Sequence, residues 1–293
     1  MSAGPALEQR IAELTQCHVP FVKATVVRAR RPASAHPGDT AVVLADGSIE
    51  GFVGGVCAEA TVRVQALRTL RSGESLLLRI SPGSPGADDP GEPGEIEDGA
   101  LAVANPCLSG GELEIFLEPL RPAPRVAVLG DTPIARALLA FGPALGYDIT
   151  PDGEAVQDAD AVVVASHGRD EAPALTAAAR AGIPYVGLVA SPKRGAAVVA
   201  DLDLTREERA RIRTPAGVWI GARTPGEVAV SILAEIIASL RAATVAEPEP
   251  RSAVDPVCGM TVAIAADTPY ADAGGERHWF CCPACRDRYA EAG

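Results

Sequence analysis

The sequence lacks an apolar run long enough to cross a bilayer, and it is short of positive charge. No stretch reaches the roughly 18 apolar residues that a spanning helix needs, because the apolar segment 231–240 is interrupted by Glu235. Lys and Arg number 26 against 38 Asp and Glu, so the net charge of −12 repels phosphate backbones and anionic lipid surfaces. We therefore expect no membrane insertion and no nucleic acid partner.

The first twenty residues also lack the unbroken apolar stretch of a signal peptide, because Glu8, Arg10 and Glu13 interrupt it. This pattern predicts a cytoplasmic protein. The 29 Gly and 25 Pro follow no triplet period, which excludes a collagen-like chain. With 47% hydrophobic and 22% charged residues, the 293-residue chain has the composition of a globular protein of about two domains.

Residues 1–121 combine strand patterns with one long helical pattern, which predicts a mixed α/β domain. Apolar positions at helical spacing follow Gly55 and end at Ser72 and Gly73. An Asp46-Gly47 turn joins two of the strand patterns into a hairpin. The strand patterns lie at 22–27, 40–44, 49–53, 76–80 and 113–117.

Residues 122–242 alternate short apolar strands with helices, the pattern of a parallel sheet with crossover helices. This predicts a Rossmann-like second domain, so the fold class is α/β. The strands are expected at 125–129, 161–165 and 185–189, and the helices at 133–145, 172–181 and 224–240.

Residues 243–253 form a polar, proline-containing linker, and 254–293 are too few to be held by a hydrophobic core alone. Four of the seven cysteines lie in this last segment, which predicts a small cysteine-rich, metal-binding module. Thiolates are ligands for zinc or another thiophilic metal. The candidate ligands are Cys258, Cys281, Cys282 and Cys285.

This module resembles a YHS domain, and Cys258, Cys281 and Cys285 fall on the cysteine positions of that family. The resemblance implies zinc or another thiophilic metal. Two readings stay open: a metal that only folds the module, and a metal that the module senses or delivers.

A cysteine of the first domain, Cys57, follows Gly54 and Gly55 and falls in the first turn of the predicted helix. Unpaired amides and the positive end of the helix dipole favour thiolate there. Cys57 is therefore a candidate nucleophile, persulfide carrier or ligand, with a small core residue as the alternative.

A second thiol, Cys107, stands before Gly110 and Gly111 in a glycine-rich turn that precedes a strand. Backbone amides of such a turn can approach an anionic ligand closely. Two such segments in one domain favour a functional role for these cysteines over an ordinary structural one.

The second domain places polar residues where open parallel sheets bind ligands, after the carboxyl ends of strands. His167 follows one strand and can relay protons, while Lys193 and Arg194 follow another and can clamp a phosphate. The alternative is an ordinary loop with solvated charges. Gly130 retains the first glycine of a dinucleotide-binding turn, but Thr132 replaces the glycine that lets the backbone approach a pyrophosphate.

Residues 21–240 resemble the XdhC/CoxI family of accessory proteins that mature xanthine and carbon monoxide dehydrogenases. Cys57 and Cys107 match the glycine-rich cysteine motifs of that family, and its polar second-domain motifs match His167, Asp170, Ser191, Lys193 and Arg194. The stretches that carry the resemblance are GGVCAEA (54–60), CLSGGELEIFLEPL (107–120), SHGRDEAPAL (166–175), YVGLVASPKR (185–194) and PAGVWIGARTPGEVAVSILAEI (215–236).

The resemblance implies a non-catalytic chaperone that binds molybdenum cofactor (molybdopterin) transiently, assists its sulfuration and delivers it to an apo-molybdoenzyme. It implies a cysteine desulfurase as a further partner, and we expect a homodimer. Two other functions stay open: an NAD(P)-dependent oxidoreductase, favoured by the Rossmann-like sheet, and a metal-handling protein that acts through the YHS-like module.

Overall fold

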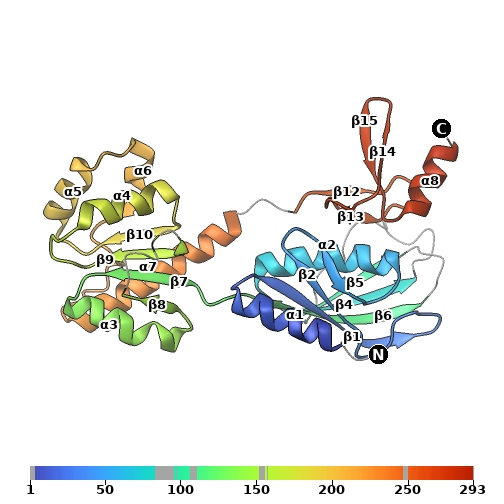
Figure 1. Ribbon diagram of the computed structural model, residues 1–293, viewed down its shortest axis with the longest axis horizontal. Helices are drawn as coiled ribbons and strands as arrows, with labels where there is room; N and C mark the ends of the chain where they lie inside the picture. The colour runs from blue at the N-terminus through green and yellow to red at the C-terminus, as the bar shows by residue number, and fades with distance from the viewer. Residues whose placement is uncertain are drawn as a thin grey trace. The chain divides into compact units, whose positions relative to one another are not determined.

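The computed structural model describes residues 4–82, 96, 98–105, 111–151, 156, 158–246 and 250–292. The chain forms two compact units (Figure 1). The first unit joins residues 1–122 to the C-terminal residues 248–293, and the second consists of residues 123–247. The predicted fold class is confirmed, with a mixed sheet and a parallel sheet in separate units.

The first unit is built on a six-stranded mixed sheet with the order β3-β2-β1-β6-β4-β5. All neighbouring strands are antiparallel except β4 and β5, which run parallel. The predicted hairpin forms between β2 and β3 around Gly47, whose φ of 83° suits glycine. The strands are β1 (Phe21–Arg30), β2 (Thr40–Leu44), β3 (Ile49–Gly51), β4 (Leu76–Pro82), β5 (Ala100–Asn105) and β6 (Glu112–Leu120).

Helix α2 (Val56–Ser72) packs on one face of this sheet. Ala58, Val62 and Ala66 recur at four-residue spacing and are buried in the same core as the strand residues Val22 and Ile115. The helix ends at Gly73, which takes a left-handed φ of 73°. This packing fixes the position of the α2 N-terminus, where Cys57 lies.

Helix α1 (Pro5–Gln16) covers part of the opposite face of the sheet. Its Leu14 packs with Phe21 and Val42. Phe21 and Val22 are adjacent in β1 and join different cores because successive side chains of a strand point to opposite faces.

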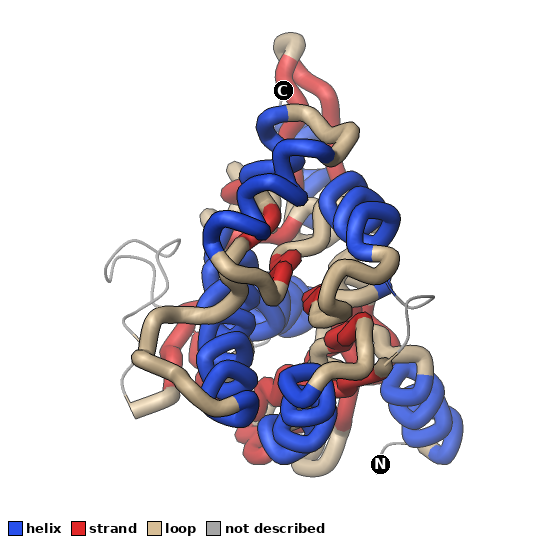
Figure 2. The backbone as a smooth tube through the Cα atoms, turned by 90° about the vertical axis from the view of Figure 1, so that its left-hand side faces the viewer, coloured by secondary structure: helices blue, strands red, loops and turns tan. Residues whose placement is uncertain are grey.

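The C-terminal module belongs to the first unit and consists of two short hairpins and a helix. Phe280 is its most deeply buried aromatic residue and packs with Met260 and Val262. Helix α8 leads to the marked C-terminus in Figure 2 and contacts β14. The elements are β12 (Ser252–Val254), β13 (Thr261–Ala263), β14 (Tyr270–Ala273), β15 (Glu276–Trp279) and α8 (Pro283–Ala292).

The second unit has a five-stranded parallel sheet with the order β11-β10-β9-β7-β8. Helices α3 and α7 pack on one face, and α4 and α5 pack on the other. The strands are β7 (Arg125–Leu129), β8 (Asp148–Thr150), β9 (Ala161–Val164), β10 (Tyr185–Leu188) and β11 (Ile212–Arg213). The helices are α3 (Pro133–Phe141), α4 (Glu171–Ala181), α5 (Pro192–Asp201), α6 (Arg206–Ala210) and α7 (Pro225–Ala246), with a 3₁₀ turn at Pro143–Leu145.

Some elements differ from the sequence-based prediction. The helix expected over 133–145 ends at Phe141, because Pro143 has no N–H to continue the α-helical hydrogen bonds and starts a 3₁₀ turn instead. Strands β5 and β8 and helices α5 and α6 were not predicted. None of the described helices combines the length and hydropathy of a membrane span.

Candidate functional site

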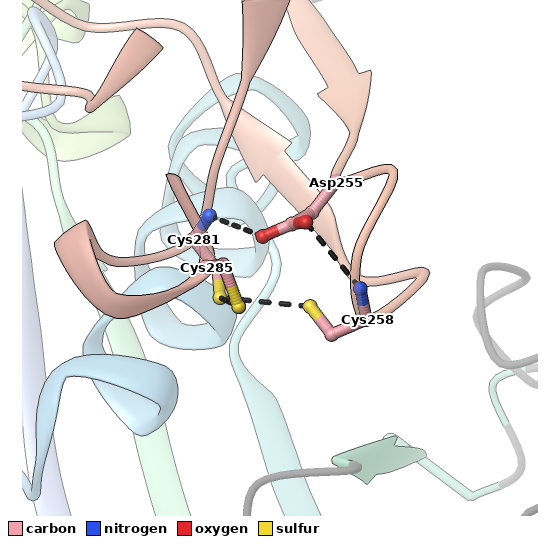
Figure 3. A group of neighbouring side chains, drawn as sticks. All are labelled: Asp255, Cys258, Cys281 and Cys285. Carbon is pink, nitrogen blue, oxygen red and sulfur yellow. Dashed lines mark hydrogen bonds between the residues drawn. The ribbon is translucent and has the colours of Figure 1, made fainter. Parts of the chain in front are cut away.

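Three cysteines of the C-terminal module converge with one carboxylate. Cys258 lies between β12 and β13, Cys281 follows β15, and Cys285 lies in the first turn of α8. The Sγ atoms of Cys258 and Cys281 are 3.6 Å apart, and those of Cys281 and Cys285 are 3.7 Å apart (Figure 3). These sulfurs and a carboxylate oxygen of Asp255 all lie within 4.8 Å of one another.

The spacing of the sulfurs fits a tetrahedral thiolate site. Zinc–sulfur bonds of about 2.3 Å in tetrahedral geometry separate neighbouring sulfurs by about 3.8 Å. The two sulfur–sulfur distances of 3.6 and 3.7 Å are close to this value. The donor set therefore suits zinc or another thiophilic metal, and a fourth ligand would close it.

Asp255 connects the two loops that carry the cysteines. One carboxylate oxygen accepts hydrogen bonds from the backbone N–H of Val257 (2.8 Å) and of Cys258 (3.4 Å), and the other accepts from that of Cys281 (2.8 Å). The residue is fully buried. Burial opposes ionisation, but the backbone donors at Cys281 and Val257 outweigh it and hold the pKa of Asp255 below its usual range. Asp255 thus positions the ligand loops as a buried carboxylate.

The thiols of the cluster ionise unequally. The hydrogen bond with Cys281 lowers the pKa of Cys258, whereas that same hydrogen bond, a second one with Cys57 and burial raise the pKa of Cys281. Burial raises the pKa of Cys285. The thiol of Cys258 is therefore easier to deprotonate than an ordinary thiol and those of Cys281 and Cys285 are harder, and binding of a metal as thiolates would release protons from the cluster.

The cluster includes three of the four metal ligands predicted from the sequence. Cys282 is half-buried and does not belong to it, although it is adjacent to Cys281. Its side chain nevertheless interacts with that of Cys285 and packs against the core of the module. Sequence reasoning missed Asp255, whose signal was an acidic residue three positions before a candidate ligand, the spacing at which a side chain caps a turn.

The structure brings Cys57 to this same cluster. Cys57 lies in the first turn of α2, half-buried, and packs with Ala60 against the core that contains Cys281 and Cys285. Gly55 is the N-cap of α2, and Gly54 takes a φ of 142° that favours glycine. The site of the first domain and that of the module are therefore neighbours.

The other glycine-rich segment lies only partly within the described residues. Cys107 and Gly110 lie outside the described residues. A Cβ added at Gly111 would lie 2.3 Å from the carbonyl oxygen of Pro32, so close backbone packing accounts for this glycine.

The polar candidates of the second unit gather at one edge of the parallel sheet, because they follow the carboxyl ends of the neighbouring strands β7, β9 and β10. Gly130 follows β7. His167 and Asp170 follow β9, and these two residues are exposed. Ser191 caps α5 by accepting a hydrogen bond from the N–H of Arg194, and Lys193 is exposed.

Glu171, which sequence reasoning missed, organises this edge. Its buried carboxylate accepts hydrogen bonds from the N–H of Gly168 (2.8 Å), the hydroxyl of Ser166 (3.3 Å) and the guanidinium of Arg194. Burial opposes ionisation, but Arg194 and then Gly168 outweigh it and hold the pKa of Glu171 below its usual range. Arg194 is thus already paired with a carboxylate.

Gly130 serves the packing of the sheet. It has a φ of 110°, and a Cβ there would lie 2.3 Å from the carbonyl oxygen of Ala165. Thr132 is buried and accepts a hydrogen bond from the N–H of Ala135, so one helix-start amide of α3 is already satisfied. This turn therefore departs from a dinucleotide-binding turn, because the side chain of Thr132 stands where a glycine lets the pyrophosphate approach and it occupies one of the helix-start amides.

A cleft of about 680 Å³ lies beside α1 in the first unit. Among the described residues that line it, none is a site residue predicted from the sequence. Arg10, its cation, donates hydrogen bonds of 2.9 and 3.0 Å to the carboxylate of Glu50, and Asp39 adds a further acidic group. This charge distribution does not favour a phosphate-bearing ligand.

Family models match both parts of the chain that precede the module. The model of the XdhC and CoxI family matches residues 14–81, and the model of the XdhC Rossmann domain matches residues 126–236. Together they cover more than half of the chain. The chain belongs to the XdhC and CoxI family. The YHS-like character of the module stays a prediction.

Two curated proteins of Escherichia coli strain K12 are similar to this member of the family. The molybdenum cofactor insertion chaperone PaoD is 29% identical over 265 residues, which cover 75% of this chain and 83% of PaoD. The uncharacterized protein YqeB is 28% identical over 258 residues, which cover 77% of this chain but only 44% of YqeB.

A crystal structure described as a xanthine dehydrogenase from Bacillus halodurans is also similar. It is 15% identical in sequence with a TM-score of 0.38, and the match covers 82% of this chain and 97% of that one. The family assignment does not depend on this likeness.

Proposed function

We propose that this chain is a molybdenum cofactor insertion chaperone. It binds the cofactor transiently, assists its sulfuration with sulfur from a cysteine desulfurase, and delivers it to an apo-molybdoenzyme of the xanthine dehydrogenase or carbon monoxide dehydrogenase type. We place it in the cytoplasm, as a homodimer. The observation that carries the proposal is the similarity to PaoD, which extends over both family domains and 83% of that chaperone.

We propose a separate role for each unit in handling the cofactor: thiols of the first domain act on the metal, and basic residues of the second domain bind a phosphate. Cys57 is suited to this role because the α2 N-terminus favours thiolate. Cys107 is the second proposed thiol. Lys193 is the better phosphate ligand of the second domain, because it is exposed whereas Arg194 is paired with Glu171. His167 and Asp170 follow the adjacent strand β9 and are further candidates at this edge of the sheet.

The test is the pterin and metal content of full-length protein purified from a host that makes molybdenum cofactor. Wild type is compared with Cys57→Ala and Cys107→Ala, and Cys17→Ala, at an exposed cysteine, is the matched control. We expect pterin in the wild type and the control and its loss in a cysteine variant that remains folded. Absence of pterin from the wild type, together with no binding of added cofactor, would contradict the proposal.

The phosphate contact has its own test. Lys193→Ala should weaken cofactor binding by the worth of one charge-assisted hydrogen bond, about 1.5 to 3 kcal/mol. Arg194→Ala is less clean, because it also removes the partner of the buried Glu171. An unchanged affinity in Lys193→Ala would show that the phosphate is bound elsewhere.

A second candidate is a metal-handling protein, favoured by the three converging thiols of the module. Here the metal, and not pterin, is the cargo. Replacing Cys258 and Cys285 by Ser should then abolish metal content and function together. If metal content falls while cofactor delivery persists, this candidate fails.

An NAD(P)-dependent oxidoreductase is the weaker alternative. Thr132 and Gly130 have structural roles in the turn that would hold the pyrophosphate. Ligand binding to the native state raises the melting temperature by mass action, so a thermal shift with NAD or NADP measures this directly. We expect no shift.

A further inference from the structure

We propose that Cys57 is the fourth sulfur ligand of a metal ion held by Cys258, Cys281 and Cys285. The metal site would then be shared by the first domain of the chain and its C-terminal module. The inference does not depend on the chaperone activity.

The first support is proximity. Cys57 and Ala60, one helical turn apart on α2, pack against the module core that contains Cys281 and Cys285. The side chains of Cys57 and Cys281 are thus in the same packed cluster. The sulfurs of the module lie at tetrahedral spacing, and Cys57 lies outside the group of donor atoms within 4.8 Å, so metal binding requires its side chain to move toward them.

The second support is that several contacts hold α2 against the module. Arg63, two turns along the helix from Cys57, donates two hydrogen bonds to the carboxylate of Asp267, at 2.7 and 2.8 Å. Helix α2 also contacts β13. On the same side, a Cβ added at Gly47 would lie 3.3 Å from the side chain of Ala265. The approach of Cys57 to the cluster is thus part of an extended interface.

The third support is that the competing ligand, the carboxylate of Asp255, already accepts hydrogen bonds. Asp255 is the carboxylate that lies within 4.8 Å of the three sulfurs, but both of its oxygens already accept backbone hydrogen bonds. Metal binding through Asp255 would weaken the contacts that position Cys258 and Cys281. A cysteine is also the better ligand for a thiophilic ion beside three other thiolates.

Four thiolates would make a closed site of the kind that binds Zn²⁺ without a position for substrate. A metal in this site would also cover the sulfur of Cys57. Binding of zinc and any reaction at Cys57 would therefore exclude each other.

The test uses full-length protein that has been stripped with a chelator under reducing conditions and reloaded with Zn²⁺ alone. X-ray absorption at the zinc edge counts the sulfur ligands, and a competition titration gives the affinity. We expect four sulfurs in wild type, and in Cys57→Ser three sulfurs and an affinity lower by more than about a hundredfold, which exceeds the roughly 10- to 100-fold effect of losing a residue that only supports a ligand. Cys17→Ser, at an exposed cysteine outside the module, is the control and should behave as wild type. Cys282→Ser tests the competing sulfur beside Cys285 and should keep four sulfur ligands.

Three sulfurs in the wild type, equal affinities in Cys57→Ser and Cys17→Ser, or loss of a sulfur ligand in Cys282→Ser with four kept in Cys57→Ser, would overturn the proposal. So would failure of the wild type to bind zinc. A second measurement needs no variant: we expect zinc to protect Cys57 from alkylation while the exposed Cys17 reacts equally with and without zinc. Equal alkylation of Cys57 in the two states would refute the shared site even if Cys57→Ser does not fold.

Discussion

Arg63 of α2 and Asp267 of the C-terminal module form a two-point ion pair, with both guanidinium nitrogens within 2.8 Å of the carboxylate oxygens. The Arg63 side chain is 14% exposed and that of Asp267 is 65% exposed. The hydrogen bonds from Arg63 hold the pKa of Asp267 below its usual range. This pair lies at the junction of two segments that are far apart in the sequence.

Arg63→Gln is predicted to loosen the junction without touching a sulfur. An ion pair with one exposed partner is worth about 0.2 to 1 kcal/mol, so alkylation of Cys57 in zinc-free protein should accelerate by up to about fivefold. Mass spectrometry of the labelled peptide gives the rate. Arg277→Gln, which removes an ion pair with Asp272 inside the β14–β15 hairpin, is the control and should leave the rate unchanged.

Asp255→Asn is predicted to destabilise the ligand loops. An amide keeps one acceptor oxygen but turns an N–H₂ group toward a backbone donor, at a cost of about 1 to 3 kcal/mol. Hydrogen exchange at the amides of Val257, Cys258 and Cys281 should accelerate. Asp272→Asn, the control, changes an exposed carboxylate of the same module and should not affect the exchange of these amides. If the amides remain protected from exchange in Asp255→Asn, the carboxylate of Asp255 does not position them.

Glu171→Gln is predicted to lower the free energy of unfolding of the second unit by about 1.5 to 3 kcal/mol, the worth of a hydrogen bond to a charged group. The substitution removes the carboxylate that pairs with Arg194 and holds the loop after β9. Urea unfolding followed by circular dichroism measures the change. Glu207→Gln, at an exposed position in the same unit, should have little effect.

The same carboxylate gives a pH dependence. The pKa of Glu171 in the folded state lies below the unfolded value of about 4.3, so its contribution is complete above that pH and is lost as the pH falls through the folded value. The stability of wild type should therefore fall on acidification below about pH 4.3, and that of Glu171→Gln should fall less. Parallel curves for the two proteins would exclude this assignment.

Gly130→Ala is predicted to lower the free energy of unfolding by more than a left-handed backbone alone would explain. Gly146 is the matched control, since its φ of 78° is also positive but a Cβ there meets nothing within 4 Å. Gly146→Ala should cost about 1 to 2 kcal/mol. Gly130→Ala should exceed this because its Cβ would meet the Ala165 carbonyl. If urea unfolding shows equal losses of stability in Gly130→Ala and Gly146→Ala, the loop after β9 moves away from the added Cβ without a free-energy cost.

The sequence predicted the elements whose signals are local. Helix α2 lies between Gly55 and Gly73, and the β2–β3 hairpin is set by its Asp-Gly turn. Strand β5 was not predicted. It is a short edge strand, and its conformation depends on pairing with β4 more than on the hydrophobic pattern of its own residues. The same holds for β8, which pairs only at one edge of the parallel sheet.

Contacts between distant segments could not be predicted. Three metal-ligand candidates were found because cysteines in a small module are conspicuous, but nothing near Cys57 in the sequence indicates Cys281. Glu171 was missed for the same reason, since its partner Arg194 belongs to the next strand–helix connection. Gly130 matched a ligand-binding motif, yet its observed contact is with the backbone after β9.

The module that carries Cys258, Cys281 and Cys285 is part of the same chain as the helix that it contacts. Its docking is therefore a unimolecular event whose equilibrium does not change on dilution. Covalent attachment raises the local concentration of the module, so its apolar contacts and one partly exposed ion pair need not be strong enough to hold a separate chain. A bimolecular complex with the same contacts would dissociate on sufficient dilution, whereas this contact within one chain does not depend on concentration.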